Sequence, residues 1–272
     1  MFQHRFKRTG LTALALVLSA AAAQATTLNI TVTNLQSEGG LSATPLYLGF
    51  HNGSFDAFDN GGVASAGLKE IAETGSPAAI AAQRRATDPN SQGLVLASPD
   101  GPPPIQPGET VSGQITLEQT GATFLSFLSM VLPSNDTFIG NDDAYAYQVL
   151  DDSGSFVGPF TIDVTGNHFY DAGTEANGLL GSAFVRDQDI SLNPAGEGTI
   201  SLATTLAEFA GATLATGDVL GDAAQLDFAS DRAAFGLLSI AVTEVAAPVP
   251  LPASGLLLGL GLGLFGWVRR KA

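Results

Sequence analysis

The feature that most constrains the fold of this chain is a series of short segments in which apolar and polar residues alternate. Residues 28–35 alternate Leu, Ile and Val with Asn and Thr, slipping by one at the last step, and residues 110–118 alternate more regularly. Because a period of two places every second side chain on one face of a strand, each segment is expected to bury one face. Residues 124–132 are almost wholly apolar, which predicts a central strand covered on both faces.

Turn-forming residues separate these segments along the chain. Clusters of Gly, Pro, Asn and Asp, such as Asp88-Pro89-Asn90 and residues 101–104, favour turns. Two short stretches, residues 67–73 and 77–86, are expected to be helical. Further strands are expected at residues 46–50, 145–150, 160–164, 198–203 and 235–245. Many strands of moderate length with turns between them predict an all-β fold, an antiparallel sandwich with short helices, over residues 26–245.

The N-terminal residues 1–25 have the pattern of an export signal. Three basic residues precede an apolar run, and the segment ends in Ala23-Gln24-Ala25. Signal peptidase accepts small residues at the third and first positions before the cleaved bond, so cleavage is expected after Ala25. A retained membrane anchor is the alternative.

The C-terminal residues 246–272 have the pattern of a membrane tail. Val249, Pro250, Leu251, Pro252 and Ala253 precede a Leu- and Gly-rich run and three final basic residues. The strictly apolar part is about 15 residues, marginal for a membrane span until the Pro-rich segment is added. Basic residues after an apolar run stay on the cytoplasmic side. A small-residue site before a hydrophobic stretch is also the order found in tails that are removed.

This tail closely resembles the VPLPA variant of the PEP-CTERM sorting signals of Gram-negative bacteria, which Val249 to Ala253 matches letter for letter. The resemblance implies that an exosortase-type membrane protease is a partner, and that the tail holds the protein in the inner membrane during sorting to the cell surface. An ordinary anchor helix is the alternative, and either interpretation places the middle of the chain outside the cytoplasm.

Charge and residue content exclude several classes of function. Six of the 11 basic residues lie in the two ends, which leaves five against 26 acidic residues in the middle. Such a surface repels nucleic acid and attracts cations. The chain has no cysteine, so neither disulfides nor thiolate metal sites hold it together.

An ordered set of motifs runs from roughly Thr27 to Gly178. Its sharpest segments are Pro133-Ser134-Asn135-Asp136-Thr137-Phe138-Ile139-Gly140 and Tyr170-Asp171-Ala172-Gly173-Thr174-Glu175. The set resembles the spondin N-terminal domain, the module of F-spondin and mindin that also occurs in secreted bacterial proteins. The resemblance implies a C2-like sandwich with a divalent-cation site, and an adhesion or recognition role.

Both motifs place acids in loops bounded by Gly and Pro, and Ca²⁺ takes six to eight oxygen ligands. The resemblance implies that Glu118, Asp136 and Asp171 are ligands of Ca²⁺, with Glu175 in reserve. The two aspartates align directly with the motifs, whereas Glu118 does not. An Asp beside a turn often only accepts hydrogen bonds from backbone amides, which is the alternative reading of these acids.

Catalysis has little support in the sequence. After the first 25 residues the chain has two histidines, His51 and His168, and it has no Gly-x-Ser-x-Gly motif. We therefore expect a non-enzymatic surface or matrix module with a protein or exopolysaccharide partner. A hydrolase of surface polymers and a purely structural surface-layer protein are the alternatives.

Overall fold

The computed structural model describes residues 25–99, 104–118, 121–196 and 198–246. Ala23 and the motif from Val249 to Ala253 lie outside the described residues, so the cleavage site and the sorting tail stay predictions. Within the described ranges, no helix is both long and apolar enough to cross a bilayer.

The first of two antiparallel sheets has four strands in the order β5-β1-β12-β9. Their bounds are Thr26–Asn34 for β1, Thr110–Leu117 for β5, Phe160–Thr165 for β9 and Gly236–Glu244 for β12. In β1, Leu28, Ile30 and Val32 are fully buried while the Asn and Thr residues between them are partly exposed. The alternation therefore buries one face of this sheet, as the sequence predicts.

The second sheet has its strands in the order β11-β10-β7-β6-β3-β4, and β2 and β8 also pair with β6. The bounds are Ser42–Ala43 (β2), Leu46–His51 (β3), Gln92–Leu96 (β4), Thr123–Leu132 (β6), Thr137–Gly140 (β7), Gln148–Leu150 (β8), Phe169–Asp171 (β10) and Ser201–Leu202 (β11).

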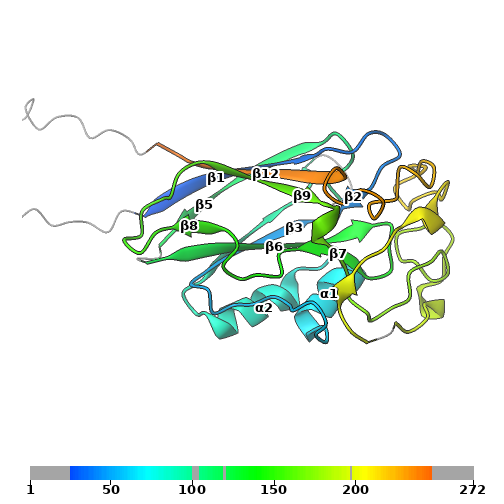
Figure 1. The fold of residues 1–272 in the computed structure, drawn as a ribbon, viewed down its shortest axis with the longest axis horizontal. Helices are drawn as coiled ribbons and strands as arrows, with labels where there is room; N and C mark the ends of the chain where they lie inside the picture. Colours follow the sequence, from blue (N-terminus) through cyan, green and yellow to red (C-terminus); the bar gives the residue numbers. More distant parts are fainter. Residues whose placement is uncertain (1–24, 100–103, 119–120, 197, 247–272) are drawn as a thin grey trace, which may run out of the picture.

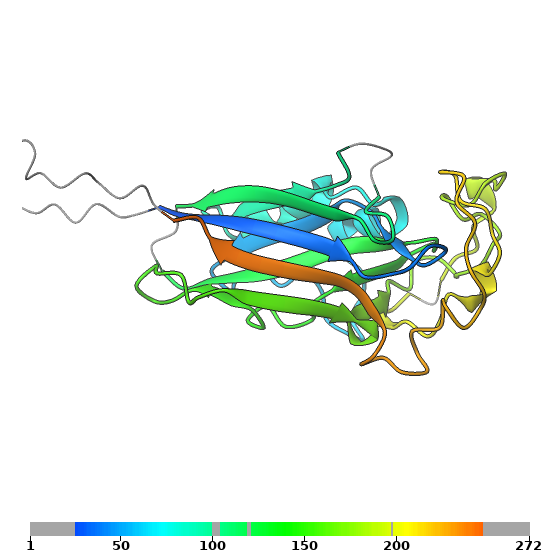
Figure 2. The same cartoon turned by 90° about the horizontal axis from the view of Figure 1, so that it is seen from above.

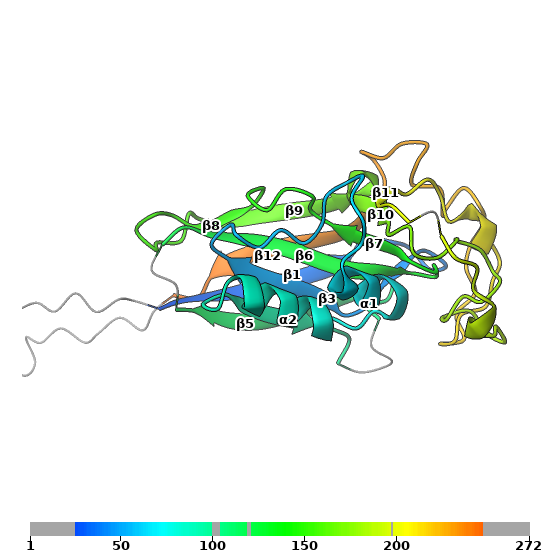
Figure 3. The same cartoon turned by 90° about the horizontal axis from the view of Figure 1, so that it is seen from below.

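Two helices, α1 (Ala66–Thr74) and α2 (Ala78–Thr87), cover the outer face of the second sheet, which gives three layers (Figures 1 and 3). In β6, Leu125 and Phe127 belong to the core between the sheets, and Leu128 belongs to the core under the helices. Because β6 lies between two apolar layers, nearly all of its residues are buried. The prediction of a central strand covered on both faces is confirmed.

Most residues between β10 and β12 gather at one end of the sandwich, opposite the start of β1 and the end of β12 (Figure 2). They contain the short helices η2 (Ile190–Leu192) and η3 (Ala207–Phe209), while η1 (Gly166–His168) precedes β10. Phe209 and Phe228 are fully buried, and the Phe228 ring stacks on Phe169 with ring centroids 4.3 Å apart. This segment is therefore part of the core.

The all-β sandwich with two short helices is confirmed, while several strand boundaries differ from the prediction. The strand expected at 145–150 contains only Gln148–Leu150, because a turn forms where the Tyr145 amide donates to Asp143 Oδ1 over 2.8 Å. The strand expected at 198–203 is reduced to Ser201–Leu202. The short strands β2, β4, β7 and β10 were not expected from the sequence pattern.

Candidate cation site

Strand pairing brings the two motif aspartates together at one end of the sandwich. Asp136 lies in the connection between β6 and β7, and Asp171 is the last residue of β10. Strands β7 and β10 pair with Asp171 opposite Thr137, the residue after Asp136. The Ala172 amide also donates to the Asp136 carbonyl oxygen over 3.2 Å. Residues 35 positions apart in sequence are therefore neighbours.

Asp136 is fully buried, and only one of its two carboxylate oxygens has hydrogen-bond donors. Oδ2 accepts from the Thr174 amide at 2.8 Å, the Thr174 hydroxyl at 3.2 Å and the Glu175 amide at 2.9 Å. Oδ1 is buried and has no hydrogen-bond partner. A buried carboxylate oxygen without a donor is unfavourable, so this atom marks a place where the folded chain lacks a positive group.

The loop after Asp171 is held in shape by its own backbone and by Asn177. Asp171 Oδ1 accepts from the Gly173 amide at 2.8 Å, and Oδ2 accepts from Asn177 Nδ2 at 3.0 Å. Gly173 has a φ of +68°, and a Cβ atom there would lie 2.2 Å from the Thr199 carbonyl oxygen. The Gly of this motif is therefore required both by its conformation and by the lack of space.

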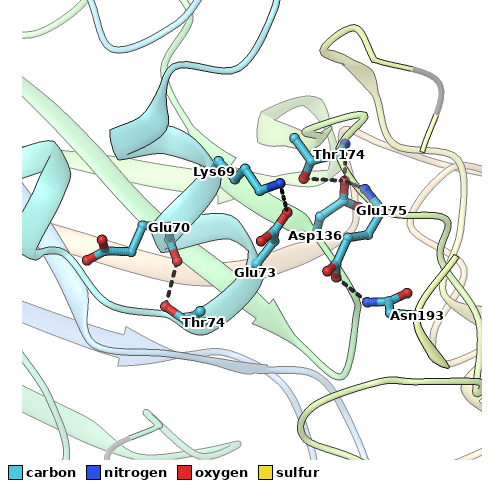
Figure 4. A network of polar contacts seen from close by, with 8 residues as sticks. All are labelled: Lys69, Glu70, Glu73, Thr74, Asp136, Thr174, Glu175 and Asn193. Atoms are coloured by element: carbon cyan, nitrogen blue, oxygen red, sulfur yellow. Dashed lines mark hydrogen bonds and ion pairs between the residues drawn. The ribbon is translucent and has the colours of Figure 1, made fainter. Parts of the chain in front are cut away.

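Two glutamates complete an acidic group around Asp136, which Figure 4 shows with its polar contacts. Glu175 accepts a short hydrogen bond from Asn193 Nδ2. Glu73, in the last turn of α1, has a buried Oε1 that accepts no hydrogen bond, although Lys69 Nζ lies 3.4 Å away at ion-pair distance. The sequence pattern did not single out Glu73, because a glutamate four residues after a lysine on a helix is typical of an exposed pair.

Two carboxyl groups of this site, those of Asp136 and Glu175, have a raised pKa and resist ionisation. Burial, followed by the nearby charge of Asp171, raises the pKa of Asp136 to about 6. Burial, followed by the charges of Glu73 and Asp136, raises the pKa of Glu175 to about 7. Negative groups that raise one another's pKa in this way favour a cation among them.

Glu118, the third expected ligand, is not part of this group. It follows β5 beside the start of β6, whereas Asp136 lies past the end of β6, about 30 Å away at the usual rise per residue. Glu118 is exposed and lines a cavity of about 610 Å³ together with Asp88 and Asn52. The prediction that Glu118 joins the two aspartates is wrong, because β5 and β6 place the two residues at opposite ends of the sandwich.

The carboxylate side chains of this site are of the type that binds divalent cations, but they do not form a complete set of ligands. Within the described residues, no three His, Asp or Glu side chains converge closely enough to hold a metal ion. Asp136 offers a free oxygen, and Glu175 would have to turn away from Asn193 to join it. Backbone carbonyls and water supply the remaining oxygens in many Ca²⁺ sites.

Each of the two histidines accepts a backbone amide hydrogen bond through Nδ1. His51 is fully buried, and burial lowers its pKa to about 4. Its Nδ1 accepts from the Gly53 amide at 3.1 Å, so the neutral ring carries its proton on Nε2, which donates to Ser126 Oγ at 2.9 Å. Nδ1 of His168 likewise accepts from the Thr165 amide at 3.2 Å. In this arrangement His51 cannot take the proton of Ser126.

A comparison with protein-family models agrees with the sequence motifs. The family model Spondin_N matches residues 43–188, which is more than half of the chain. The matched range contains Asp136, Asp171 and Glu175, and it ends before the buried segment around Phe228. No curated protein matches the chain. The chain belongs to the Spondin_N family.

Proposed function

We propose that this protein is a non-catalytic extracellular recognition module in which one Ca²⁺ ion joins the Asp136 loop to the Asp171 loop. Membership of the Spondin_N family supports an extracellular recognition module in general terms. The observation that carries the proposal of Ca²⁺ is the buried Asp136 Oδ1, which lacks a donor although the other oxygen of the same carboxylate has three. A bound cation would supply the missing positive group.

Within this proposal each residue has a definite part. Asp136, directly before β7, and Asp171, at the end of the paired strand β10, would hold the ion, and Glu175 would approach it from the second loop. The amides of Thr174 and Glu175 orient Asp136 through Oδ2, which leaves Oδ1 for the ion. By neutralising the group, the ion would fix both loops and the surface that they form.

The partners and the route to the surface are part of the same proposal. Signal peptidase would remove residues 1–25, and an exosortase-type protease would act at Val249 to Ala253 while the tail lies in the inner membrane. The rigid loop surface would then bind a protein or exopolysaccharide of the cell surface or its matrix. The hydrogen bonds of His51 speak against hydrolysis as the role of the domain.

A thermal melt of the chelator-stripped protein with and without Ca²⁺ tests the cation site. Extracellular Ca²⁺ modules bind at about 10⁻⁴–10⁻³ M, and an ion that binds the folded state alone raises the melting temperature. We expect 10 mM Ca²⁺, roughly ten times the upper end of that range, to raise the melting temperature of the wild type and of Glu118→Gln equally. Asp136→Asn and Asp171→Asn should remove the rise. The proposal is wrong if the wild type does not respond, or if Glu118→Gln responds as the aspartate variants do.

A further inference from the structure

Two consecutive arginines at the end of α2 stand out in a strongly acidic protein. Only five basic residues face 26 acidic ones between the two ends of the chain, and Arg84 and Arg85 are two of those five. Both lie in the last turn of α2, and both line a cavity of about 580 Å³ with residues of β3, β4 and β5. This cavity is separate from the acidic group around Asp136.

Arg84 is a buried cation that forms no ion pair among the described residues. It is only 2% exposed, and its Nε donates to the Tyr47 hydroxyl at 2.5 Å. Its Nη1 is buried and has no hydrogen-bond partner. Among the described residues the one ion pair is that of Lys69 with Glu73. No carboxylate of these residues therefore lies within ion-pair distance of Arg84. An isolated buried charge is costly unless something pairs with it.

Asp88, the acid one helical turn after Arg84, is engaged elsewhere. Its Oδ2 accepts from the Asn52 amide at 3.0 Å, and its Oδ1 accepts from the Asn90 amide at 3.1 Å. Asp88 therefore caps the neighbouring turns and forms no ion pair with the guanidinium.

The sheet beneath Arg84 leaves room for this guanidinium. Gly49 of β3 and Gly93 of β4 are directly opposite each other in the strand register. A Cβ atom at Gly49 would lie 2.9 Å from Arg84 Cδ, and one at Gly93 would lie 3.1 Å from Arg84 Nη2. Neither glycine has a positive φ, so the backbone does not require them. The two glycines instead leave the space in which the Arg84 side chain lies across the sheet.

We propose that Arg84 and Arg85 bind an oxyanion group, a carboxylate, sulfate or phosphate, carried by a small hydroxylated ligand or free in solution. Guanidinium groups match the oxygen spacing of these anions and bind them with two parallel hydrogen bonds. The anion would supply a negative charge beside Arg84, which has no ion pair among the described residues, and exposed Arg85 would close over it from the rim. Gln114 and Thr116, exposed on β5 at the same cavity, offer amide and hydroxyl groups to a ligand such as an acidic sugar.

Calorimetric titration of the full-length chain, with chelator present to remove any effect of divalent cations, tests this site. Glucuronate, inorganic phosphate and inorganic sulfate are titrated at low ionic strength, with glucose as the uncharged control. We expect at least one of the three anions to bind and glucose not to bind. Glucuronate binding would indicate a sugar-borne carboxylate, and binding of the inorganic ions alone would indicate free anions.

Variants separate a built site from general charge effects. Arg85→Gln removes an exposed charge at the cavity, and we expect it to weaken the binding of the same anion at least tenfold. Arg186→Gln removes an exposed charge outside the cavity and should leave the affinity unchanged. Gly93→Ala, which crowds Arg84 Nη2, should also weaken binding. The proposal is overturned if no anion binds at about 10 mM, or if Arg85→Gln and Arg186→Gln bind alike.

Discussion

The last turns of α1 and α2 lie over the same sheet but end in opposite charge environments. Glu73 at the end of α1 belongs to an acidic group with Asp136 and Glu175, and one lysine at 3.4 Å only partly offsets it. Arg84 at the end of α2 stands beside Arg85 with no carboxylate in ion-pair distance among the described residues. In each place the fold buries charge of one sign and leaves a polar atom without a partner.

The two places also differ in what holds them in shape. The acidic group depends on loop backbone, with amides of Thr174 and Glu175 fixing Asp136. The basic site depends on side chains lying across regular strands, with space provided by Gly49 and Gly93. Changes to the backbone should therefore lower the stability of the protein strongly at the acidic group and only slightly at the basic site.

The largest expected effect is therefore that of Gly173→Ala at the acidic end. A Cβ atom there meets the Thr199 backbone at 2.2 Å and must also adopt a φ of +68°. We expect a loss of about 3 kcal/mol or more in the free energy of unfolding, measured by urea titration. Gly61→Ala is the matched control, because Gly61 has a φ of +87° but no atom within 4 Å, and it should lose only about 1 kcal/mol. Equal losses would show that space at Gly173 is unimportant.

The pH dependence of stability gives the next largest effect. Because the pKa values of Asp136 and Glu175 are raised on folding, the native state binds more protons than the unfolded state between about pH 4 and 7. The metal-free protein should therefore lose stability as pH rises through this window, on the order of 2–3 kcal/mol from Asp136 alone. Asp136→Asn should remove the Asp136 share of this loss, and leave that of Glu175, in denaturant titrations at pH 4.5 and 7.5. A variant with the same pH slope as the wild type would contradict the assignment.

A smaller effect is expected at the basic site in the absence of an anion. The double variant Arg84→Met with Tyr47→Phe replaces a buried cation and its hydrogen-bond partner by apolar groups of similar size. Such replacements are often neutral or stabilising, so we expect a gain between zero and about 1 kcal/mol in urea titrations. A loss above about 2 kcal/mol would show that the fold needs the Arg84–Tyr47 hydrogen bond more than it suffers from the unpaired charge.

The sequence predicts the layered sandwich well because its signals are local. Alternation marks β1 and β5, an apolar run marks β6, and the two helices lie within two residues of the expected ranges. The short strands β2, β4, β7 and β10 are missed because so short a run carries no readable period, and β8 and β11 are expected at too great a length. The proximity of Asp136 and Asp171 was expected from their motifs, and the pairing of β7 with β10 gives the structural cause.

The remaining features of both charged sites depend on long-range packing. Glu73 joins the acidic group only because α1 packs against the sheet beside the Asp136 loop, and no local pattern encodes that contact. Glu118 was misplaced because β6 runs the length of the sandwich between Glu118, beside its start, and Asp136, past its end. The isolation of Arg84 is likewise invisible in sequence, where Asp88 four residues later resembles an ion-pair partner.

The most direct test of the acidic group is a Ca²⁺ titration of the wild-type protein at pH 6.5 in two buffers with different ionisation enthalpies. Asp136 and Glu175, with pKa values near 6 and 7, are partly protonated at this pH. An ion that binds their carboxylates must displace those protons, as metal binding to protonated ligands does. The account predicts that Ca²⁺ binds with proton release, seen as a heat that differs between the buffers and shrinks at pH 8. Binding with equal heats in both buffers, or no binding, would contradict it.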